Sequence, residues 1–156
     1  MFLYLLQHGE AVPETVDPER PLTPQGRQDI ERIGDFLAEA GVEVGRILHS
    51  GKLRTRMSAD IIAAKLGSSP VIEEQKRIMP GDSPEWLRDV AVTWKDNILV
   101  IGHHPFMGRF VSRLVLGKEM PVVVDFTPGA IVCLARRGAT GAWFISWMLT
   151  PPLLHR

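Results

Sequence analysis

Three short polar segments of the chain hold the residue types that could do chemistry. Each directly follows an apolar run: residues 7–10 read Gln-His-Gly-Glu, residues 49–54 read His-Ser-Gly-Lys-Leu-Arg, and residues 102–105 read Gly-His-His-Pro. Imidazoles and a guanidinium beside small residues suit a tetrahedral oxyanion, because arginine offers a planar fork of donors and helix N-termini add further N–H groups. The composition of these segments therefore predicts a pocket for a phosphoryl group.

The apolar runs before these segments are expected to be strands of one sheet. Residues 2–6, 44–48 and 97–101 are runs of strand length, and residues 2–6 are apolar on both faces, as in a parallel sheet covered on both sides. The carboxyl ends of parallel strands lie at one edge of the sheet, where ligands bind in α/β domains. We therefore expect the three polar segments to converge there.

Helical patterns fill the stretches between the expected strands. Thr23 is a suitable N-cap before Pro24 at the first helical position, and Ser83 is expected to cap a later short helix. Apolar residues at helical spacing also follow Leu53 and Pro105. Each expected strand that leads into a polar segment is thus followed by a helix.

The last part of the chain has a different pattern. Apolar and alternating residues at 131–134 and 143–149 predict an antiparallel hairpin, with a turn at Arg137 to Gly141. Together the elements predict an α/β fold: a three-layer α/β/α sandwich with a mostly parallel central sheet and this hairpin at its end. We expect residues 1–156 to form one domain of this kind.

Composition excludes several classes of protein. Lys and Arg together (18) balance Asp and Glu (18), so no net charge attracts nucleic acid or an anionic membrane. Cys133 is the single cysteine, which excludes an internal disulfide and a multi-cysteine zinc site. The apolar run Met1–Leu6 is too short to span a membrane and follows no basic residue. We therefore expect a cytoplasmic protein that binds neither nucleic acid nor membrane.

Four motifs resemble those of one known family, the histidine phosphatase superfamily. In chain order they are Leu6-Gln7-His8-Gly9-Glu10, Arg20-Pro21-Leu22-Thr23, Ser50-Gly51-Lys52-Leu53-Arg54 and Ile101-Gly102-His103. The likeness spans essentially the whole chain. The chain is similar in particular to the short, SixA-type phosphohistidine phosphatase branch of the family. It implies a phosphoglycerate mutase-like fold and a phosphatase that needs no metal or other cofactor.

The resemblance also implies roles for individual residues. His8 falls on the nucleophilic histidine, Arg54 on a phosphate-binding arginine and His103 on the second histidine, while Arg20 and Gly9 fall near the phosphate. The imidazole of His8 would attack phosphorus in line, and water would hydrolyse the resulting phosphohistidine. Arg54 and His103, in its charged form, would hold the phosphoryl oxygens.

Gln7 departs from the family pattern. The family motif reads Arg-His-Gly, whereas Gln7 stands at the arginine position of this chain. A neutral amide still donates two hydrogen bonds, but charge-assisted bonds are about twice as strong. We therefore expect Gln7 to contribute to phosphate binding more weakly than arginine, with Arg20 taking a larger share.

The class of substrate can be inferred from how much its leaving group needs a proton. An alkoxide leaving a phosphate ester needs a well-placed acid, whereas an imidazole that carries a proton on its other nitrogen leaves neutral, with a conjugate-acid pKa of about 6.5. Glu10, Asp82 and Glu85 are the candidate acids, and no motif singles one of them out. This favours phosphohistidine on a protein, such as a phosphotransfer or carrier domain, over an ester.

Alternatives remain open on the sequence alone. The chain could be a small-molecule phosphomonoesterase, or Gln7 could make it a phosphate- or phosphoprotein-binding module with weakened activity. Inorganic phosphate or another oxyanion is expected in the site in each case. A zinc site of His8, His103 and His104 is disfavoured because Arg54 would repel the ion.

Two further histidines are expected outside the pocket. His104 is adjacent to His103, and neighbouring side chains at a strand end point to opposite sides, so His104 is predicted to be the N-cap before Pro105. His49 is expected to pack behind the second polar segment rather than to bind the ligand.

Overall fold

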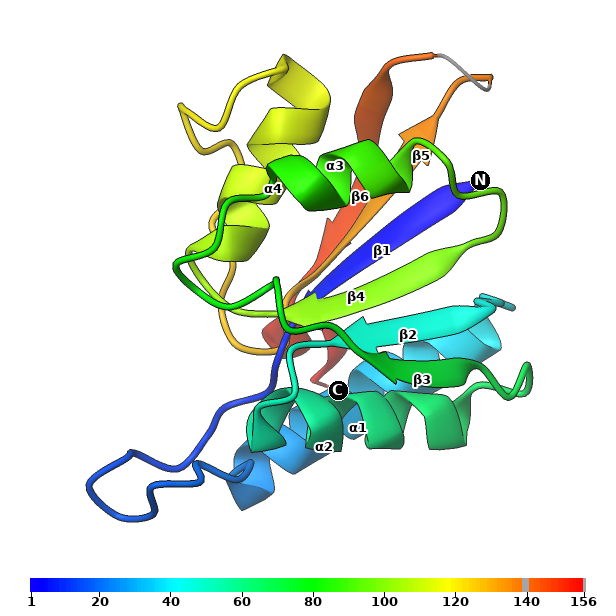
Figure 1. The fold of residues 1–156 in the computed structure, drawn as a ribbon. Helices are drawn as coiled ribbons and strands as arrows, with labels where there is room; N and C mark the ends of the chain where they lie inside the picture. Colours follow the sequence, from blue (N-terminus) through cyan, green and yellow to red (C-terminus); the bar gives the residue numbers. More distant parts are fainter. Residues whose placement is uncertain (139–140, 156) are drawn as a thin grey trace.

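Six strands form one mixed sheet at the centre of the molecule (Figure 1). The computed structural model describes residues 1–138 and 141–155. The order across the sheet is β3-β2-β4-β1-β5-β6. The strands are β1 (Phe2–Gln7), β2 (Arg46–His49), β3 (Val71–Glu74), β4 (Ile98–Gly102), β5 (Ile131–Arg136) and β6 (Trp143–Leu149).

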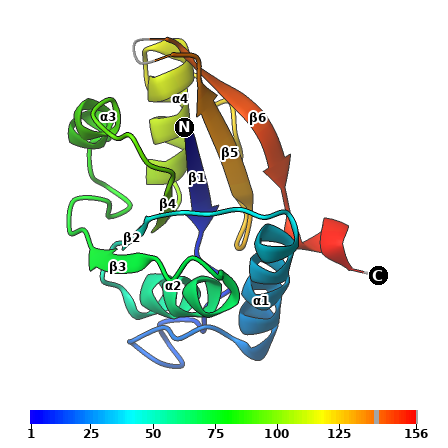
Figure 2. The ribbon, with the colours of Figure 1, turned by 90° about the vertical axis from the view of Figure 1, so that its right-hand side faces the viewer.

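Helices cover both faces of the sheet, as Figures 1 and 2 show. The helices are α1 (Pro24–Glu39), α2 (Leu53–Lys65), α3 (Glu85–Ala91) and α4 (Phe106–Leu116), and a short 3₁₀ helix, η1 (Pro151–Leu154), follows β6. Helices α1 and α2 lie on one face and α3 and α4 on the other. The predicted three-layer α/β/α arrangement is confirmed.

The two faces of β1 explain why residues 2–6 of this strand are all apolar. Leu3 and Leu5 belong to the core under α3 and α4, whereas Tyr4 and Leu6 belong to the core under α1 and α2. Successive side chains of a strand point to opposite faces, so a strand covered on both sides needs apolar residues at every position. The central placement of β1 in the sheet follows from this pattern.

The parallel and antiparallel parts of the sheet divide at β1. Strands β1, β4, β2 and β3 pair in parallel, and β5 and β6 pair antiparallel as a hairpin. The predicted C-terminal hairpin is therefore confirmed. Its turn was expected at Arg137 to Gly141, of which residues 139–140 lie outside the described part of the chain.

The ends of the helices agree in part with the expected caps. Thr23 caps α1, accepting a hydrogen bond from the Gly26 N–H at 2.9 Å. In α3 the N-cap position belongs to Pro84, and Ser83 only accepts a 3.4 Å bond from the Glu85 N–H. The prediction that Ser83 caps this helix is therefore wrong by one position, because Pro84, which has helical backbone angles, is the N-cap residue. Among the described residues, no helix is long and apolar enough to cross a bilayer.

Candidate active site

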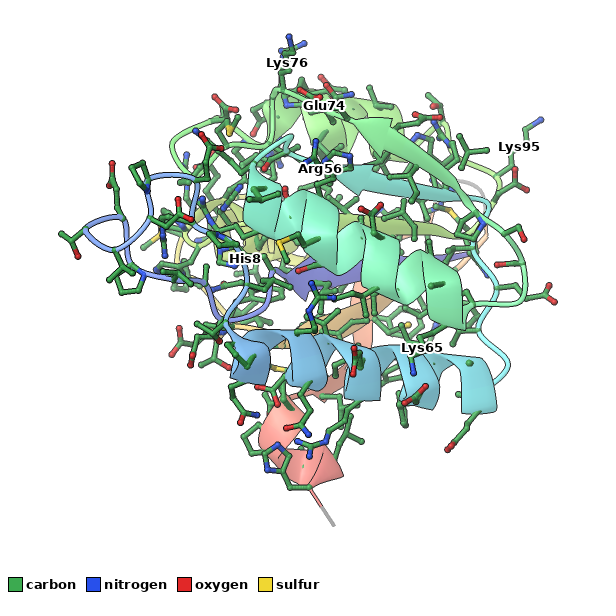
Figure 3. All side chains as sticks on the ribbon, turned by 90° about the horizontal axis from the view of Figure 1, so that it is seen from below. His8, Arg56, Lys65, Glu74, Lys76 and Lys95 are labelled. Atoms are coloured by element: carbon green, nitrogen blue, oxygen red, sulfur yellow. The ribbon has the colours of Figure 1, made fainter. Side chains whose placement is uncertain are left out.

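The three polar segments meet at the carboxyl edge of the sheet. Gln7 at the end of β1 pairs with Gly102 at the end of β4, and His49 at the end of β2 pairs with Ile101. The residues that follow these positions are His8, Ser50 and His103. Figure 3 shows His8 beside the first turn of α2, with Lys65 at the opposite end of that helix. The expected convergence is confirmed.

Arg54, in the first turn of α2, joins the two histidines. Its Nε donates to Nε2 of His8 at 3.3 Å, and its Nη2 contacts Nδ1 of His103 at 3.3 Å. The two imidazole rings stand edge to face with centroids 5.2 Å apart. A guanidinium can only donate hydrogen bonds. Both contacted nitrogens therefore present lone pairs, and both rings are neutral in this arrangement.

The ring of His8 is held by the backbone of its neighbour. Nδ1 lies 2.7 Å from the carbonyl oxygen of Gly9, which can only accept, so Nδ1 carries the ring proton and Nε2 carries the lone pair. Burial, opposed by the bond to Gly9 and reinforced by the charges of Arg54 and Arg20, lowers the pKa of His8 to about 4. At neutral pH the Nε2 lone pair is thus available for attack on phosphorus.

His103 is buried next to the same guanidinium. Burial, followed by the nearby charges of His8 and Arg54, lowers the pKa of His103 to about 3. Its Nε2 lies 2.6 Å from the hydroxyl of Ser50. A bound phosphate would raise both pKa values, because an opposite charge favours the protonated ring.

Gly9 has a packing reason to be glycine. A Cβ on Gly9 would lie 2.8 Å from the carbonyl oxygen of Gly26 in the first turn of α1 and 2.8 Å from a side-chain carbon of Ile30. The Gly9 N–H donates to the hydroxyl of Ser58, which in turn donates to the carbonyl of Arg54. The segment after β1 is thereby held against both α1 and α2.

Arg20 reaches the site from the loop between β1 and α1. It has a left-handed backbone conformation (φ 51°), which costs free energy for a residue other than glycine, and its Nε donates to the carbonyl of Val12 at 3.1 Å. Its charge contributes to the lowered pKa values of His8, Arg54 and His103. The loop therefore places a second guanidinium close to Arg54.

Gln7 lies at the same edge, directly before His8. It continues the series of Leu3 and Leu5 on β1, and only 7% of it is exposed. Its Oε1 is buried and has no hydrogen-bond partner among the described residues. A buried acceptor without a donor is unfavourable, and such groups are concentrated at functional sites.

The three carboxylates considered as general acids are engaged elsewhere. Glu10 accepts a hydrogen bond from the Thr23 hydroxyl at 2.9 Å, and Asp82 accepts one from the Met79 N–H at 2.8 Å. Glu85 is paired with Arg113, and this hydrogen bond lowers the pKa of the Glu85 carboxyl. A carboxyl with a lowered pKa is a poorer proton donor at neutral pH.

A polar hollow of about 320 Å³ opens beside Arg54. Its lining includes Arg20, Lys52, Glu14 and Glu19, and the sequence predicted no role for the two glutamates. Nothing in the sequence pattern marks Glu14 and Glu19, because they lie in a proline-rich loop whose course only the folded chain defines. These carboxylates line the hollow that contains Arg54, whereas Asp82 and Glu85 line a separate one.

His104 and His49 lie outside the cluster around Arg54. His104 is exposed, but it does not cap α4, because Pro105 occupies the N-cap position. His49 is buried, and its Nδ1 accepts the Gly51 N–H at 3.0 Å, which supports the loop that leads to Arg54. Among the described residues, no group of three or more His, Cys, Asp or Glu side chains is arranged to hold a metal ion.

Comparisons with known proteins agree with this geometry. The family model of the histidine phosphatase superfamily (branch 1) matches residues 3–78. The phosphohistidine phosphatase SixA of Escherichia coli K12 is 26% identical over 156 residues, covering 97% of this chain and 94% of that protein. An uncharacterised protein of Picosynechococcus sp. PCC 7002 is 29% identical over 124 residues, covering 76% of this chain and 75% of that protein.

Solved structures share the fold. The structure of protein histidine phosphatase SixA complexed with tungstate superposes with a TM-score of 0.88 at 24% identity, covering 99% of this chain and all (100%) of that chain. A phosphoserine phosphatase of Entamoeba histolytica superposes with a TM-score of 0.71 at 16% identity, covering 96% of each chain. With its motifs at the strand ends and this phosphoglycerate mutase-like fold, the chain is similar to the histidine phosphatase superfamily, and its similarity to SixA over 97% of its length supports a phosphatase of that type.

Proposed function

We propose that this chain, acting as one histidine phosphatase domain, removes phosphoryl groups from protein phosphohistidine through a phosphohistidine intermediate on His8. The observation that carries the proposal is the bridge of Arg54 between Nε2 of His8 and Nδ1 of His103, each at 3.3 Å. It brings a neutral nucleophile, a fork of donors and a second histidine to one point. The SixA relative, which is named a phosphohistidine phosphatase, supports the same substrate class.

The chemistry follows from the hydrogen bonds of His8. Its Nδ1 proton is held by the Gly9 carbonyl, so Nε2 forms the new bond to phosphorus while the bond from phosphorus to the leaving nitrogen breaks. The Nε–H of Arg54 must first change its hydrogen-bond acceptor from Nε2 of His8 to a phosphoryl oxygen, because a lone pair that accepts a hydrogen bond cannot attack. Water then attacks phosphorus, the P–N bond breaks, and Nε2 recovers its lone pair.

Positive charge stabilises the transferred group. The side chains of Arg54, Arg20 and Lys52 line the same hollow. Helix α2 begins at Leu53 and its N-cap residue makes no side-chain cap bond, so N–H groups of its first turn are available for an oxyanion. In this arrangement Arg54 and Arg20 supply the cationic donors that Gln7 does not.

The surroundings of His8 favour a leaving group that needs little acid. The charges that act on the pKa of His8 come from Arg54 and Arg20, and both are cationic. Glu10, Asp82 and Glu85 are held in other hydrogen bonds. A phosphohistidine leaving group departs as a neutral imidazole, so it fits this site better than an alkoxide does.

A phosphotransfer assay tests the proposal. A histidine phosphotransfer domain, phosphorylated chemically with phosphoramidate, is incubated with the wild-type protein and with the His8→Ala variant, and acid-labile phosphate is followed by phosphorus NMR. We expect release by the wild type and none above background by His8→Ala. Absence of release by a wild type that hydrolyses p-nitrophenyl phosphate well would refute the phosphohistidine assignment.

One observation favours a small phosphorylated substrate instead. Glu14 and Glu19 line the hollow beside Arg54 and could protonate an alkoxide leaving group. In that case Glu14→Gln or Glu19→Gln would reduce ester turnover strongly and spare phosphohistidine. If both variants hydrolyse an alkyl phosphate ester such as glycerol phosphate at the wild-type rate, this second function loses its support.

A further inference from the structure

A chain of hydrogen bonds runs from His103 into the first turn of α2. Nε2 of His103 lies 2.6 Å from Oγ of Ser50, and Oγ of Ser50 lies 3.0 Å from Oγ1 of Thr55. Oγ1 of Thr55 lies 2.7 Å from the carbonyl oxygen of Lys52. Ser50 and Thr55 are completely buried, so bulk solvent does not reach their hydroxyls.

The direction of each bond can be worked out from the far end. The Lys52 carbonyl only accepts, so the single hydroxyl hydrogen of Thr55 is used there. Thr55 Oγ1 can then only accept from Ser50, which uses the single hydrogen of Ser50. Ser50 Oγ therefore has only lone pairs to offer His103, and Nε2 of His103 must carry the ring proton.

We propose that Ser50 and Thr55 are positioning residues that hold His103 in the tautomer protonated on Nε2, so that the lone pair of Nδ1 faces Arg54 and the phosphoryl site. The 3.3 Å contact from Arg54 to Nδ1 is consistent with this tautomer, since the guanidinium needs an acceptor there. Both residues are completely buried, and the hydrogen bond from Ser50 to His103 connects them to the site.

The fixed tautomer has a consequence for phosphate binding. When a bound anion draws Arg54 away, Nδ1 is the ring atom that can take up a proton. The charged ring then donates a hydrogen bond from Nδ1 to a phosphoryl oxygen. Ser50 keeps accepting from Nε2 in the charged ring, because both nitrogens of imidazolium are donors. The relay thus allows His103 to become charged while it keeps its hydrogen bond to Ser50.

Nitrogen NMR of the histidine side chains tests the tautomer directly, without substrate. Protein labelled with nitrogen-15 on histidine is measured near neutral pH, and the resonances of His103 are assigned by their loss in a His103→Asn variant. We expect a protonated Nε2 and an unprotonated Nδ1. A wild-type His103 protonated on Nδ1 would overturn the proposal, whatever the enzyme turns out to hydrolyse.

Removal of one hydroxyl tests the relay. Thr55→Val keeps the volume of the side chain but frees the hydrogen of Ser50, which can then donate to Nε2 of His103. We expect the Nδ1-protonated form of His103 to appear in Thr55→Val and not in Thr55→Ser, which retains the hydroxyl. An unchanged pattern in a folded Thr55→Val variant would contradict the inference.

Two variants guard against an unfolded protein. Ser50→Ala removes the acceptor of Nε2, and we expect it to give a mixture of both His103 tautomers. Ser112→Ala removes another fully buried serine, whose hydroxyl accepts from the Val123 N–H, and should leave His103 as in the wild type.

We expect turnover to fall roughly 10- to 100-fold in Thr55→Val and to recover in Thr55→Ser, a range typical of lost partners that orient a histidine. A single tautomer in Ser50→Ala would show that Ser50 does not set it.

Discussion

The floor and the rim of the candidate active site are built differently. The floor consists of His8, Ser50, Arg54, Thr55 and His103, which hydrogen-bond to one another or to neighbouring backbone at the strand ends. The rim is the loop of residues 12–20, which carries exposed carboxylates and extends away from the sheet in Figure 1. The floor is thus suited to fixed chemistry and the rim to contact with a variable substrate.

The difference has a physical origin. Floor residues follow β1, β2 and β4, whose register is fixed by backbone pairing and by apolar cores on both faces. Burial makes each unpaired polar group there costly, so the hydrogen bonds are nearly complete. The rim has few buried contacts, and Arg20 is held in it by a single side-chain bond to the Val12 carbonyl. Changes to the floor should therefore affect the rate, and changes to the rim should affect substrate binding.

The largest effect is expected at the nucleophile of the floor. His8→Ala should lower kcat by roughly 10⁴- to 10⁶-fold, as the loss of other enzyme nucleophiles does. Rapid quenching in alkaline denaturant, in which phosphohistidine survives, should show a phosphorylated wild type and no phosphorylated variant. Circular dichroism serves as the control for folding, and a well-folded variant with wild-type turnover would remove His8 from the mechanism.

A smaller effect is expected for the arginine that joins the two histidines. Arg54→Lys keeps the charge but loses the fork that reaches both rings, and we expect kcat to fall by roughly 10²- to 10³-fold. Arg56, which is exposed and lies two residues further along α2, supplies a matched control, since Arg56→Lys should have no effect. Equal activity of the two variants would show that the site needs only a positive charge.

The buried state of His8 predicts a pH dependence. Because its pKa is lowered to about 4, kcat/KM should be independent of this group at higher pH and fall roughly tenfold per pH unit below about 4. The unfolded chain binds this proton near the ordinary pKa of 6.5. The contribution of neutral His8 to the free energy of unfolding is therefore fully present above pH 6.5 and is lost as the pH falls to the folded pKa of about 4.

Urea unfolding at several pH values measures the same linkage. The free energy of unfolding of the wild type should decrease between about pH 6.5 and 4, and the decrease should be smaller in His8→Gln, which cannot take up the proton. Identical slopes for the two proteins would mean that burial does not hold His8 neutral.

The rim should respond in binding rather than in rate. Arg20→Asn keeps a residue that tolerates φ 51° but removes the guanidinium, and we expect KM to rise by roughly tenfold with kcat nearly unchanged. Arg27→Ala, at an exposed position of α1, is the control that should leave both constants as they are. A drop in kcat alone would place Arg20 with the floor.

The smallest effect is expected at Gln7. Gln7→Arg restores the family residue next to His8, and we expect only a change of about threefold in kcat/KM, because Arg54 and Arg20 already supply cationic donors. An increase of many orders of magnitude over an almost inactive wild type would instead identify this chain as a phosphate-binding module. Isothermal titration with inorganic phosphate, which should bind both proteins, separates affinity from turnover.

The sequence by itself determined the strand and helix alternation, the antiparallel hairpin and the placement of three polar segments after buried strands. Hydrophobic periodicity and chain order carry this information, because each element must bury one or both of its faces. His8, Arg54 and His103 lie within these polar segments, and the resemblance to the histidine phosphatase superfamily assigned each of them its role.

Tertiary structure alone decided the finer points. It placed Glu14 and Glu19 beside Arg54, left Gln7 Oε1 without a donor within residues 1–138 and 141–155, and joined Ser50 to His103. These contacts link residues that are distant in the sequence or lie on irregular loops, and their hydrogen-bond directions depend on which partner is forced to accept. Local pattern carries no record of such partners, so only the folded chain could supply them.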